Sequence, residues 1–271
     1  MRFGQDPCSL PKRDSAARER RHGWPIPQNK KGNPMSEGMS KYVNMQKNWY
    51  EKAASLSKYD VNRKEDNVVG SYNEHNNWPD YDKYLLGFVD ETWKEKLALD
   101  FACGPGRNIV KYSHLFKRLD GADIAQNNLD NAKSNLEFHN IKVPNLYLTT
   151  GSNLGDAPDN TYDLIFSTIA MQHICVHEVR FNILRDMHRA LRKLGRISIQ
   201  MGFGVSPGKA GYFENNYDAI STNSGYDTMV EDVDYLRNDL SQIGFVKFSY
   251  EIRPTGPGDS HPHWIFFSAH K

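Results

Sequence analysis

The most informative segment of the chain reads Leu97-Ala98-Leu99-Asp100-Phe101-Ala102-Cys103-Gly104-Pro105-Gly106-Arg107-Asn108. An apolar run of strand character ends there in a tight turn with two glycines, and a helical pattern follows at once. Gly104 and Gly106 have no side chain, so backbone N–H groups of the turn can approach a ligand at the start of the helix. This arrangement is typical of a parallel α/β sheet that holds a nucleotide-like cofactor at the carboxyl end of its first strand.

From this turn onward strands and helices alternate, with the periodicity of buried strands and amphipathic helices. The expected strands are Leu97–Phe101, Leu119–Ile124, Leu146–Thr149, Tyr162–Ser167 and Arg196–Met201, followed by Val246–Arg253 and His263–Ala269. The expected helices are Arg107–Phe116, Asn127–His139, Val176–Leu194 with Gly195 as a left-handed cap, and Val230–Ile243. This order predicts an α/β fold with a doubly wound, seven-stranded, mostly parallel sheet and an antiparallel hairpin at its C-terminal edge.

Three segments are expected along the 271 residues. Residues 1–34 carry eight Lys or Arg against three Asp or Glu and no apolar periodicity, which predicts a disordered basic N-terminal extension. This segment is expected to be a basic arm, a transit peptide or a stretch upstream of the true start of translation. We favour the last interpretation, because Met35 and Met39 directly precede the first structured pattern. Residues 35–96 are expected to form a helical N-terminal segment, and residues 97–271 the main domain with an insert at 202–226.

Composition narrows the compartment and the partners. The net charge is +1, and the chain after residue 34 holds 26 basic and 30 acidic residues, so nothing favours nucleic acid as a partner. No run has the length and apolar character of a secretory signal or a membrane span. Cys8, Cys103 and Cys175 are too few and too scattered for a disulfide framework or a zinc module. We expect a cytoplasmic protein with no metal and no membrane partner, and the sequence does not predict its oligomeric state.

Ile109 discriminates among the candidate nucleotides. The dinucleotide fingerprint requires a third glycine at this position, so that the helix packs tightly on its strand, and a branched side chain there argues against NAD. An acidic residue remains near the end of the second strand, in Gly121-Ala122-Asp123-Ile124. The Asp123 carboxylate can accept hydrogen bonds from both ribose hydroxyls of any cofactor that contains adenosine.

Five motifs in register resemble those of the class I S-adenosylmethionine-dependent methyltransferases, in their small-molecule branch. They are Asp100–Gly106, Gly121–Ile124, Asp159–Ser167, Met171-Gln172-His173-Ile174 and Leu191-Arg192-Lys193-Leu194-Gly195-Arg196. The resemblance covers about residues 97–200 and implies a Rossmann-like fold, S-adenosylmethionine as cofactor and methyl transfer as the reaction.

The resemblance also implies which residues bind the cofactor. Asp100 is expected to orient the turn and the methionine amino group, Asp123 to take the ribose, and Ile124 to pack on the adenine. Ser167 is expected beneath the methionine moiety, and Ser152 or Asn153 at the adenine edge. The full expected set is Asp100, Ala102, Cys103, Gly104, Gly106, Asp123, Ile124, Ser152, Asn153, Leu154 and Ser167. In the simpler interpretation, Asp100 only caps the turn and Ser167 only ends a strand.

His173 is the candidate catalytic base, because it follows the fourth strand, where the active-site mouth of this fold lies. A neutral imidazole there can take a proton from an attacking oxygen or nitrogen; the alternative is a histidine that only hydrogen-bonds backbone. His173 and His177 have the i, i+4 spacing of a metal pair, but the glutamate of the zinc-protease helix is missing. A lid over the cofactor is expected from the aromatic segment with Trp49, Tyr50, Tyr72, His75, Trp78 and Tyr81.

A small polar molecule, methylated on oxygen or nitrogen or on carbon, is the expected acceptor, with the insert 202–226 as a wall of its site. The motifs of base-modifying DNA methyltransferases are missing, because the fourth strand runs into Ser167-Thr168-Ile169-Ala170. Three alternatives stay open: a nucleotide-dependent oxidoreductase, a non-catalytic cofactor-binding homologue, and a nucleic-acid or protein methyltransferase that docks through its basic N-terminus.

Overall fold

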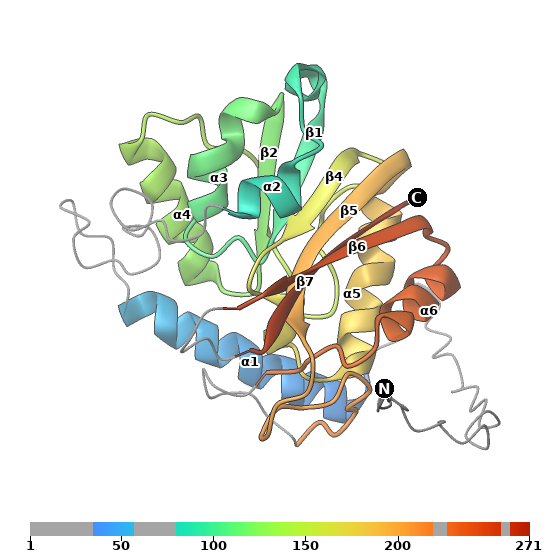
Figure 1. The fold of residues 1–271 in the computed structure, drawn as a ribbon. Coiled ribbons are helices and arrows are strands. Elements are labelled where there is room, and N and C mark those ends of the chain that lie inside the picture. The colour runs from blue at the N-terminus through green and yellow to red at the C-terminus, as the bar shows by residue number, and fades with distance from the viewer. Residues whose placement is uncertain (1–34, 57–79, 219–226, 256–260) are drawn as a thin grey trace, which may run out of the picture. The chain divides into compact units, whose positions relative to one another are not determined.

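Seven strands form one sheet in the order β3-β2-β1-β4-β5-β7-β6 (Figure 1). They are β1 Leu97–Phe101, β2 Arg118–Asp123, β3 Leu146–Leu148, β4 Tyr162–Ser167, β5 Leu191–Phe203, β6 Val246–Pro254 and β7 His263–His270. The first five strands pair in parallel, whereas β7 is antiparallel to both β5 and β6. The predicted α/β fold with an antiparallel C-terminal edge hairpin is therefore confirmed.

This computed structural model describes residues 35–56, 80–218, 227–255 and 261–271. All of them belong to one compact unit, Met35–Lys271. The predicted basic extension, residues 1–34, lies outside the described residues, as do residues 57–79 and 219–226. In the ranges that are described, none of the helices has the length and apolar character that a bilayer crossing requires.

Helices cover both faces of the sheet, and the sheet separates two apolar cores. The helices are α1 Glu37–Leu56, α2 Asp80–Leu86, α3 Arg107–Tyr112, α4 Gln126–Phe138, α5 His177–Ala190 and α6 Val233–Ile243, with short 3-10 helices η2 Glu91–Glu95, η3 Ser113–Leu115 and η4 Met171–His173. One core unites the apolar faces of α1, α5 and α6, and the other those of α2, α3 and α4. Successive residues of a strand alternate between the cores: Ala98 lies in one and Leu99 in the other.

The helix predicted at Val176–Leu194 ends four residues early, and the predicted cap at Gly195 is wrong. The last carbonyls of α5, at Arg189 and Ala190, accept hydrogen bonds from the backbone of Asn160 and Thr161, so the helix stops there and β5 begins. Leu194, not Gly195, adopts the left-handed conformation, with φ 67°. Gly195 has a different reason to be glycine, since a Cβ there would lie 2.8 Å from the Tyr162 carbonyl oxygen.

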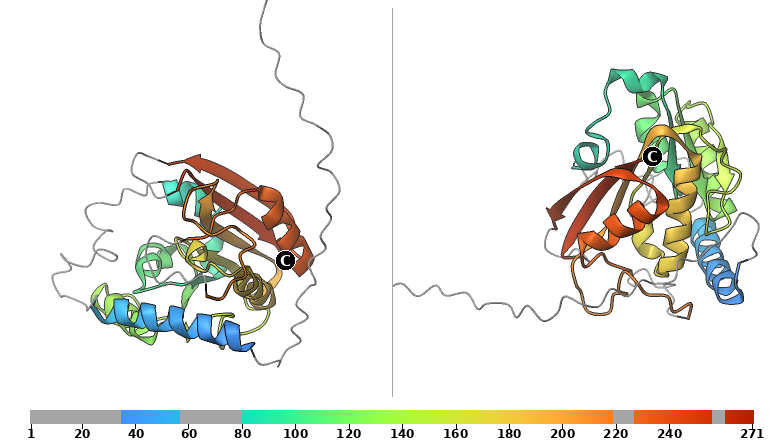
Figure 2. Two further views of the ribbon diagram at one scale, coloured as in Figure 1. Left: turned by 90° about the horizontal axis from the view of Figure 1, so that it is seen from below. Right: turned by 90° about the vertical axis from the view of Figure 1, so that its right-hand side faces the viewer.

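The other differences are at element ends. The helix expected to reach Phe116 breaks at Tyr112 into α3 and η3, and the last helix begins at Val233, where the Asp232 side chain caps it by accepting a hydrogen bond from the Asp234 N–H. The first helix, Glu37–Leu56, lies within the segment that is expected to be helical. Figure 2 shows α1 running past the edge of the sheet beside α4, against which it packs.

Candidate functional site

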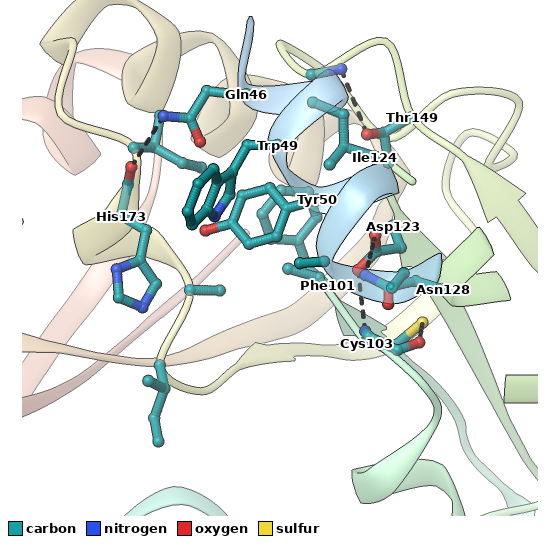
Figure 3. A pocket seen from close by; sticks show the side chains of 18 of the residues that line it. Gln46, Trp49, Tyr50, Phe101, Cys103, Asp123, Ile124, Asn128, Thr149 and His173 are labelled. Carbon is teal, nitrogen blue, oxygen red and sulfur yellow. Dashed lines mark hydrogen bonds between the residues drawn. The ribbon is translucent and has the colours of Figure 1, made fainter. Parts of the chain in front are cut away.

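A cavity of about 440 Å³ lies at the carboxyl ends of the parallel strands, between α1 and the loops after β1, β2, β3 and β4 (Figure 3). Its lining residues are Tyr42, Val43, Gln46, Trp49, Tyr50, Ala53, Ala54, Phe101, Ala102, Cys103, Gly104, Pro105, Arg107, Asn108, Asp123, Ile124, Asn128, Asn131, Thr149, Gly151, Thr168, Ile169, Ala170, His173 and Ile174. The volume falls in the range of sites for small molecules and cofactors. The cavity lies where open α/β sheets bind ligands, beyond the strands' carboxyl ends.

The turn after β1 forms the floor of the cavity with a strained backbone. Ala102, Gly104 and Gly106 all have positive φ, at 57°, 52° and 85°. A Cβ on Gly104 would meet no atom within 4 Å, whereas one on Gly106 would lie 3.1 Å from the Ala132 Cβ. Gly104 therefore leaves space in the cavity, and Gly106 serves the close packing of α3 on α4. The left-handed conformation of Ala102 is unfavourable for a residue with a Cβ, and such strain is characteristic of ligand-binding turns.

Asp123 at the end of β2 holds this turn. Its Oδ2 accepts a hydrogen bond from the Gly104 N–H at 2.9 Å, and its Oδ1 accepts from the Ala125 N–H at 2.9 Å and from Asn128 Nδ2 at 3.0 Å. Burial raises the pKa of the carboxyl, and these three hydrogen bonds oppose the rise. The structure thus brings the predicted ribose carboxylate to the glycine turn, at the cavity wall.

The N–H groups of the turn donate their hydrogen bonds to acceptors within the protein. Cys103 donates to the Ala122 carbonyl, Gly104 to Asp123, and Gly106 to the Cys103 carbonyl. Together with the missing side chain of Gly104, this means that the turn offers a ligand room rather than backbone donors. The expectation of backbone donors at the turn is not met by these N–H groups.

Helix α1 forms one wall of the cavity, in the segment where a lid is expected. Trp49 and Tyr50 project from it into the cavity, beside Phe101 of the sheet (Figure 3). Burial raises the pKa of the Tyr50 hydroxyl above its ordinary value, so the tyrosine stays neutral. The other aromatic residues expected in the lid, Tyr72, His75 and Trp78, lie outside the described residues, as does the side chain of Tyr81.

Glu51 clamps this lid to the rest of the wall, a contact that sequence patterns did not predict. Its Oε1 accepts a hydrogen bond from the Gln126 N–H at 2.8 Å and its Oε2 accepts from the Asn127 N–H at 3.0 Å. These are the first N–H groups of α4, whose own cap position is Ala125 and provides no side-chain acceptor. A carboxylate in this place satisfies free N–H groups and favours the positive end of the helix dipole.

The region that builds the sheet side of the cavity also matches a known family. Residues 98–195, from β1 into β5, match the model of a methyltransferase domain. This match supports the class I S-adenosylmethionine-dependent methyltransferase expected from the sequence. No curated protein matches the chain by sequence.

Solved structures share the methyltransferase fold. The phosphoethanolamine N-methyltransferase 2 of Haemonchus contortus, in complex with phosphomonomethylethanolamine and S-adenosylhomocysteine, is 16% identical with a TM-score of 0.58. The alignment covers 82% of this chain but only 60% of that enzyme. A methyltransferase from Mesorhizobium loti is 17% identical over 70% of this chain and 97% of its own, with a TM-score of 0.53. The cyclase SpnF is 13% identical, and the alignment covers 69% of this chain and 79% of the cyclase, with a TM-score of 0.53. At these identities the likeness shows the fold alone.

Two residues expected to contact the cofactor lie behind the wall of the cavity. Asp100 is fully buried; its Oδ1 accepts a hydrogen bond from Asn108 Nδ2 at 3.2 Å, and burial raises its pKa to about 7. Ser167 is also buried and donates its hydroxyl to the Phe101 carbonyl at 2.9 Å. Neither side chain lines the cavity: Asp100 links β1 to α3, and Ser167 links β4 to β1.

The loop after β3 contributes different residues than expected. Ser152, Asn153 and Leu154 do not line the cavity, whereas Thr149 and Gly151 of the same loop do. The Asn153 Oδ1 accepts a hydrogen bond from the Gly155 N–H at 2.8 Å and thereby closes the loop, and Leu154 is fully buried in the core. Of the expected cofactor-binding residues, those at the cavity surface are Ala102, Cys103, Gly104, Asp123 and Ile124.

The candidate base His173 lines the cavity from η4, and its ring is held by a carboxylate. Its Nδ1 lies 2.6 Å from Oδ1 of Asp227, a residue just beyond the predicted insert. His177 is not its metal partner, because the Nε2 of His177 lies 2.7 Å from Asp239 Oδ2. Among the described residues no His, Cys, Asp and Glu side chains are grouped to hold a metal ion.

The predicted substrate wall is not seen in the described part of the insert. Residues 202–218 contribute no lining residue to this cavity, and residues 219–226 lie outside the described ranges. Tyr212 is buried instead and donates its hydroxyl to Asp239 at 2.7 Å. Lys209 reaches the neighbourhood of the site, with its Nζ 3.5 Å from Asp227 Oδ2.

Proposed function

We propose that the chain transfers a methyl group from S-adenosylmethionine to a nitrogen or oxygen atom, or to a carbon atom, of a small polar molecule. The observation that carries this proposal is the cavity at the glycine turn, with Asp123 on its wall and the aromatic lid α1 above. When bound, the cofactor supplies a methyl group on a sulfonium that is already activated for in-line displacement. The protein then has to hold, orient and desolvate the reactants.

In this proposal Asp123 binds the ribose with the acceptor capacity that it has left. A carboxylate has about four lone-pair sites, and three of them already accept hydrogen bonds from the protein. One ribose hydroxyl can therefore bind without breaking the bonds that shape the turn. Ile124 and Gly151 offer an apolar surface next to it for the adenine, while Gly104 leaves room for the rest of the cofactor.

His173 is the proposed base, and Trp49 and Tyr50 are proposed to exclude water from the reacting atoms. The size of the cavity supports a small acceptor, because it suits a cofactor and a small molecule. The phosphoethanolamine N-methyltransferase among the structural neighbours is consistent with such an acceptor. A cytoplasmic location is part of the same proposal.

A matched pair of glycine variants tests the cofactor site. Gly104 and Gly208 both have positive φ, and a Cβ on either would meet no atom within 4 Å, but only Gly104 lines the cavity. Both Gly→Ala changes should lower the free energy of unfolding by about 1–2 kcal/mol. Only Gly104→Ala should also weaken binding of S-adenosylmethionine and S-adenosylhomocysteine in calorimetric titration, by at least about tenfold. Equal affinities for the two variants would contradict the assignment of this cavity.

The acceptor is tested with the full-length chain and radiolabelled S-adenosylmethionine. Phosphoethanolamine, its monomethyl form and a panel of small amines and hydroxy acids are assayed in parallel with RNA and with a protein extract. Transfer to a small molecule supports the proposal. Transfer only to a macromolecule supports the docking alternative, and cofactor binding with no transfer to any of these supports a non-catalytic homologue.

A further inference from the structure

We propose that Asp227 is the positioning residue of the site: it fixes the ring of His173 so that Nε2 is the nitrogen that exchanges a proton with the acceptor. The proposal rests on the proposed function, because it assumes that His173 is the base. Sequence patterns do not connect the two residues, which are 54 positions apart. The structure brings them together beside the cavity.

The contact itself has the geometry of a strong, charge-assisted hydrogen bond. The Nδ1 of His173 lies 2.6 Å from the Asp227 Oδ1, and Asp227 is 2% exposed. The His173 side chain is 25% exposed and lies at the cavity wall. One edge of the imidazole is thus committed to the protein interior.

The second oxygen of Asp227 is held from the opposite side by two more groups. The Nε2 of His261 lies 3.1 Å from Oδ2, and the Lys209 Nζ lies 3.5 Å from it. The side chain of His261 is buried, as Asp227 is, and that of Lys209 is 9% exposed. The three partners come from η4, from the insert and from the loop before β7, so the carboxylate joins three separate segments at one point.

The backbone on both sides of this carboxylate is also fixed. The Thr228 N–H donates to the Gln172 carbonyl at 2.8 Å, directly beside His173, and the Ala210 N–H donates to the Asp227 carbonyl at 2.8 Å. Asp227 therefore has little freedom to move relative to the ring that it contacts.

The charge of Asp227 is maintained by its neighbours. Burial by itself would raise the pKa of this carboxyl, but the hydrogen bond with His173, the close contact with His261 and the charge of Lys209 outweigh burial and hold the pKa well below its usual range. An ionised carboxylate only accepts hydrogen bonds, so it requires the proton of a neutral His173 to be on Nδ1. The lone pair of Nε2 is then the basic one.

The proposed step follows from this tautomer. As the acceptor's nitrogen or oxygen forms its bond to the methyl carbon and the carbon–sulfur bond breaks, Nε2 takes the acceptor's proton. S-adenosylhomocysteine leaves with the sulfur electron pair, and the positive charge on His173 is offset by Asp227 until the proton passes to solvent. The same division of labour between carboxylate and imidazole operates in serine proteases.

The test reads the tautomer directly and needs no acceptor. The full chain, labelled with ¹⁵N-histidine, is observed by NMR with and without S-adenosylhomocysteine, and His173→Gln assigns the signals. In the wild type, neutral His173 should be protonated on Nδ1. In Asp227→Asn, the population protonated on Nε2 should grow, because the neutral amide can donate a hydrogen bond to Nδ1 as well as accept one from it.

Asp239→Asn is the matched control. Asp239 is buried and contacts the Nε2 of His177 at 2.7 Å, yet neither residue lines the cavity. This variant should lose comparable stability and leave the His173 signals unchanged. Wild-type His173 protonated on Nε2 overturns the proposal even if Asp227→Asn does not fold, and so does an Asp227→Asn spectrum with an unchanged His173. Absence of S-adenosylhomocysteine binding to the wild type would instead count against the proposed function.

Discussion

Asp100 is fully buried and accepts a hydrogen bond from a single side chain, that of Asn108, so its ionisation makes the stability of the fold depend on pH. Among the described residues its Oδ2 has no hydrogen-bond partner. Burial raises the pKa of Asp100 to about 7, against about 3.9 in an unfolded chain. Between these values the folded state binds a proton that the unfolded state has released, so this contribution to stability is complete below about pH 4 and is lost as the pH rises through 7.

Asp100→Asn should remove this pH dependence, because the amide keeps an acceptor for Asn108 and does not ionise. The free energy of unfolding of the variant, relative to that of the wild type, should increase by on the order of a few kcal/mol from pH 4.5 to pH 8. Urea unfolding without ligand at both pH values measures the gain. A difference between the two proteins that is the same at both pH values would show that Asp100 titrates normally.

At the scale of elements, the lid helix α1 and helix α4 depend on one carboxylate. Glu51→Ala should expose the first N–H groups of α4 and release the middle of the lid, at a cost of about 0.5–2 kcal/mol in free energy of unfolding. Since α1 also closes the cavity, S-adenosylhomocysteine should dissociate faster. Stopped-flow dissociation measures the rate, and Lys52→Ala, an exposed side chain on the same helical turn, is the control. Equal rates for the two variants would mean that the lid does not depend on this clamp.

At the scale of the whole chain, the cavity and both apolar cores lie within the unit Met35–Lys271. Deletion of residues 1–34 should therefore leave the affinity for S-adenosylhomocysteine within about twofold of the full chain, and the urea midpoint unchanged. Calorimetry and urea unfolding on the two proteins check this. A loss of affinity would place part of the cofactor site in the basic segment. A loss of methylation of a macromolecule, with the cofactor affinity intact, would favour the docking alternative.

Local patterns in the sequence were sufficient for much of the fold and for part of the site. The strand Tyr162–Ser167 was predicted to the residue, and Asp123 was placed at the glycine turn correctly. Both depend on short-range information: an apolar run bounded by turn residues, and the fact that neighbouring parallel strands end at one edge of the sheet. The end of α5 was mispredicted because hydrogen bonds from Asn160 and Thr161, which are distant in sequence, stop that helix.

What the sequence determined by itself is the parallel sheet, the glycine turn after β1 and the acid at the end of β2, because each is written in residues that are close together in the chain. The tertiary structure alone decided which side chains reach the cavity: it placed Asp100 and Ser167 behind the wall and brought Glu51 to α4 across 75 positions. It also joined His173 to Asp227 across 54 positions. Such contacts depend on how whole elements pack, and no local spacing or periodicity encodes them.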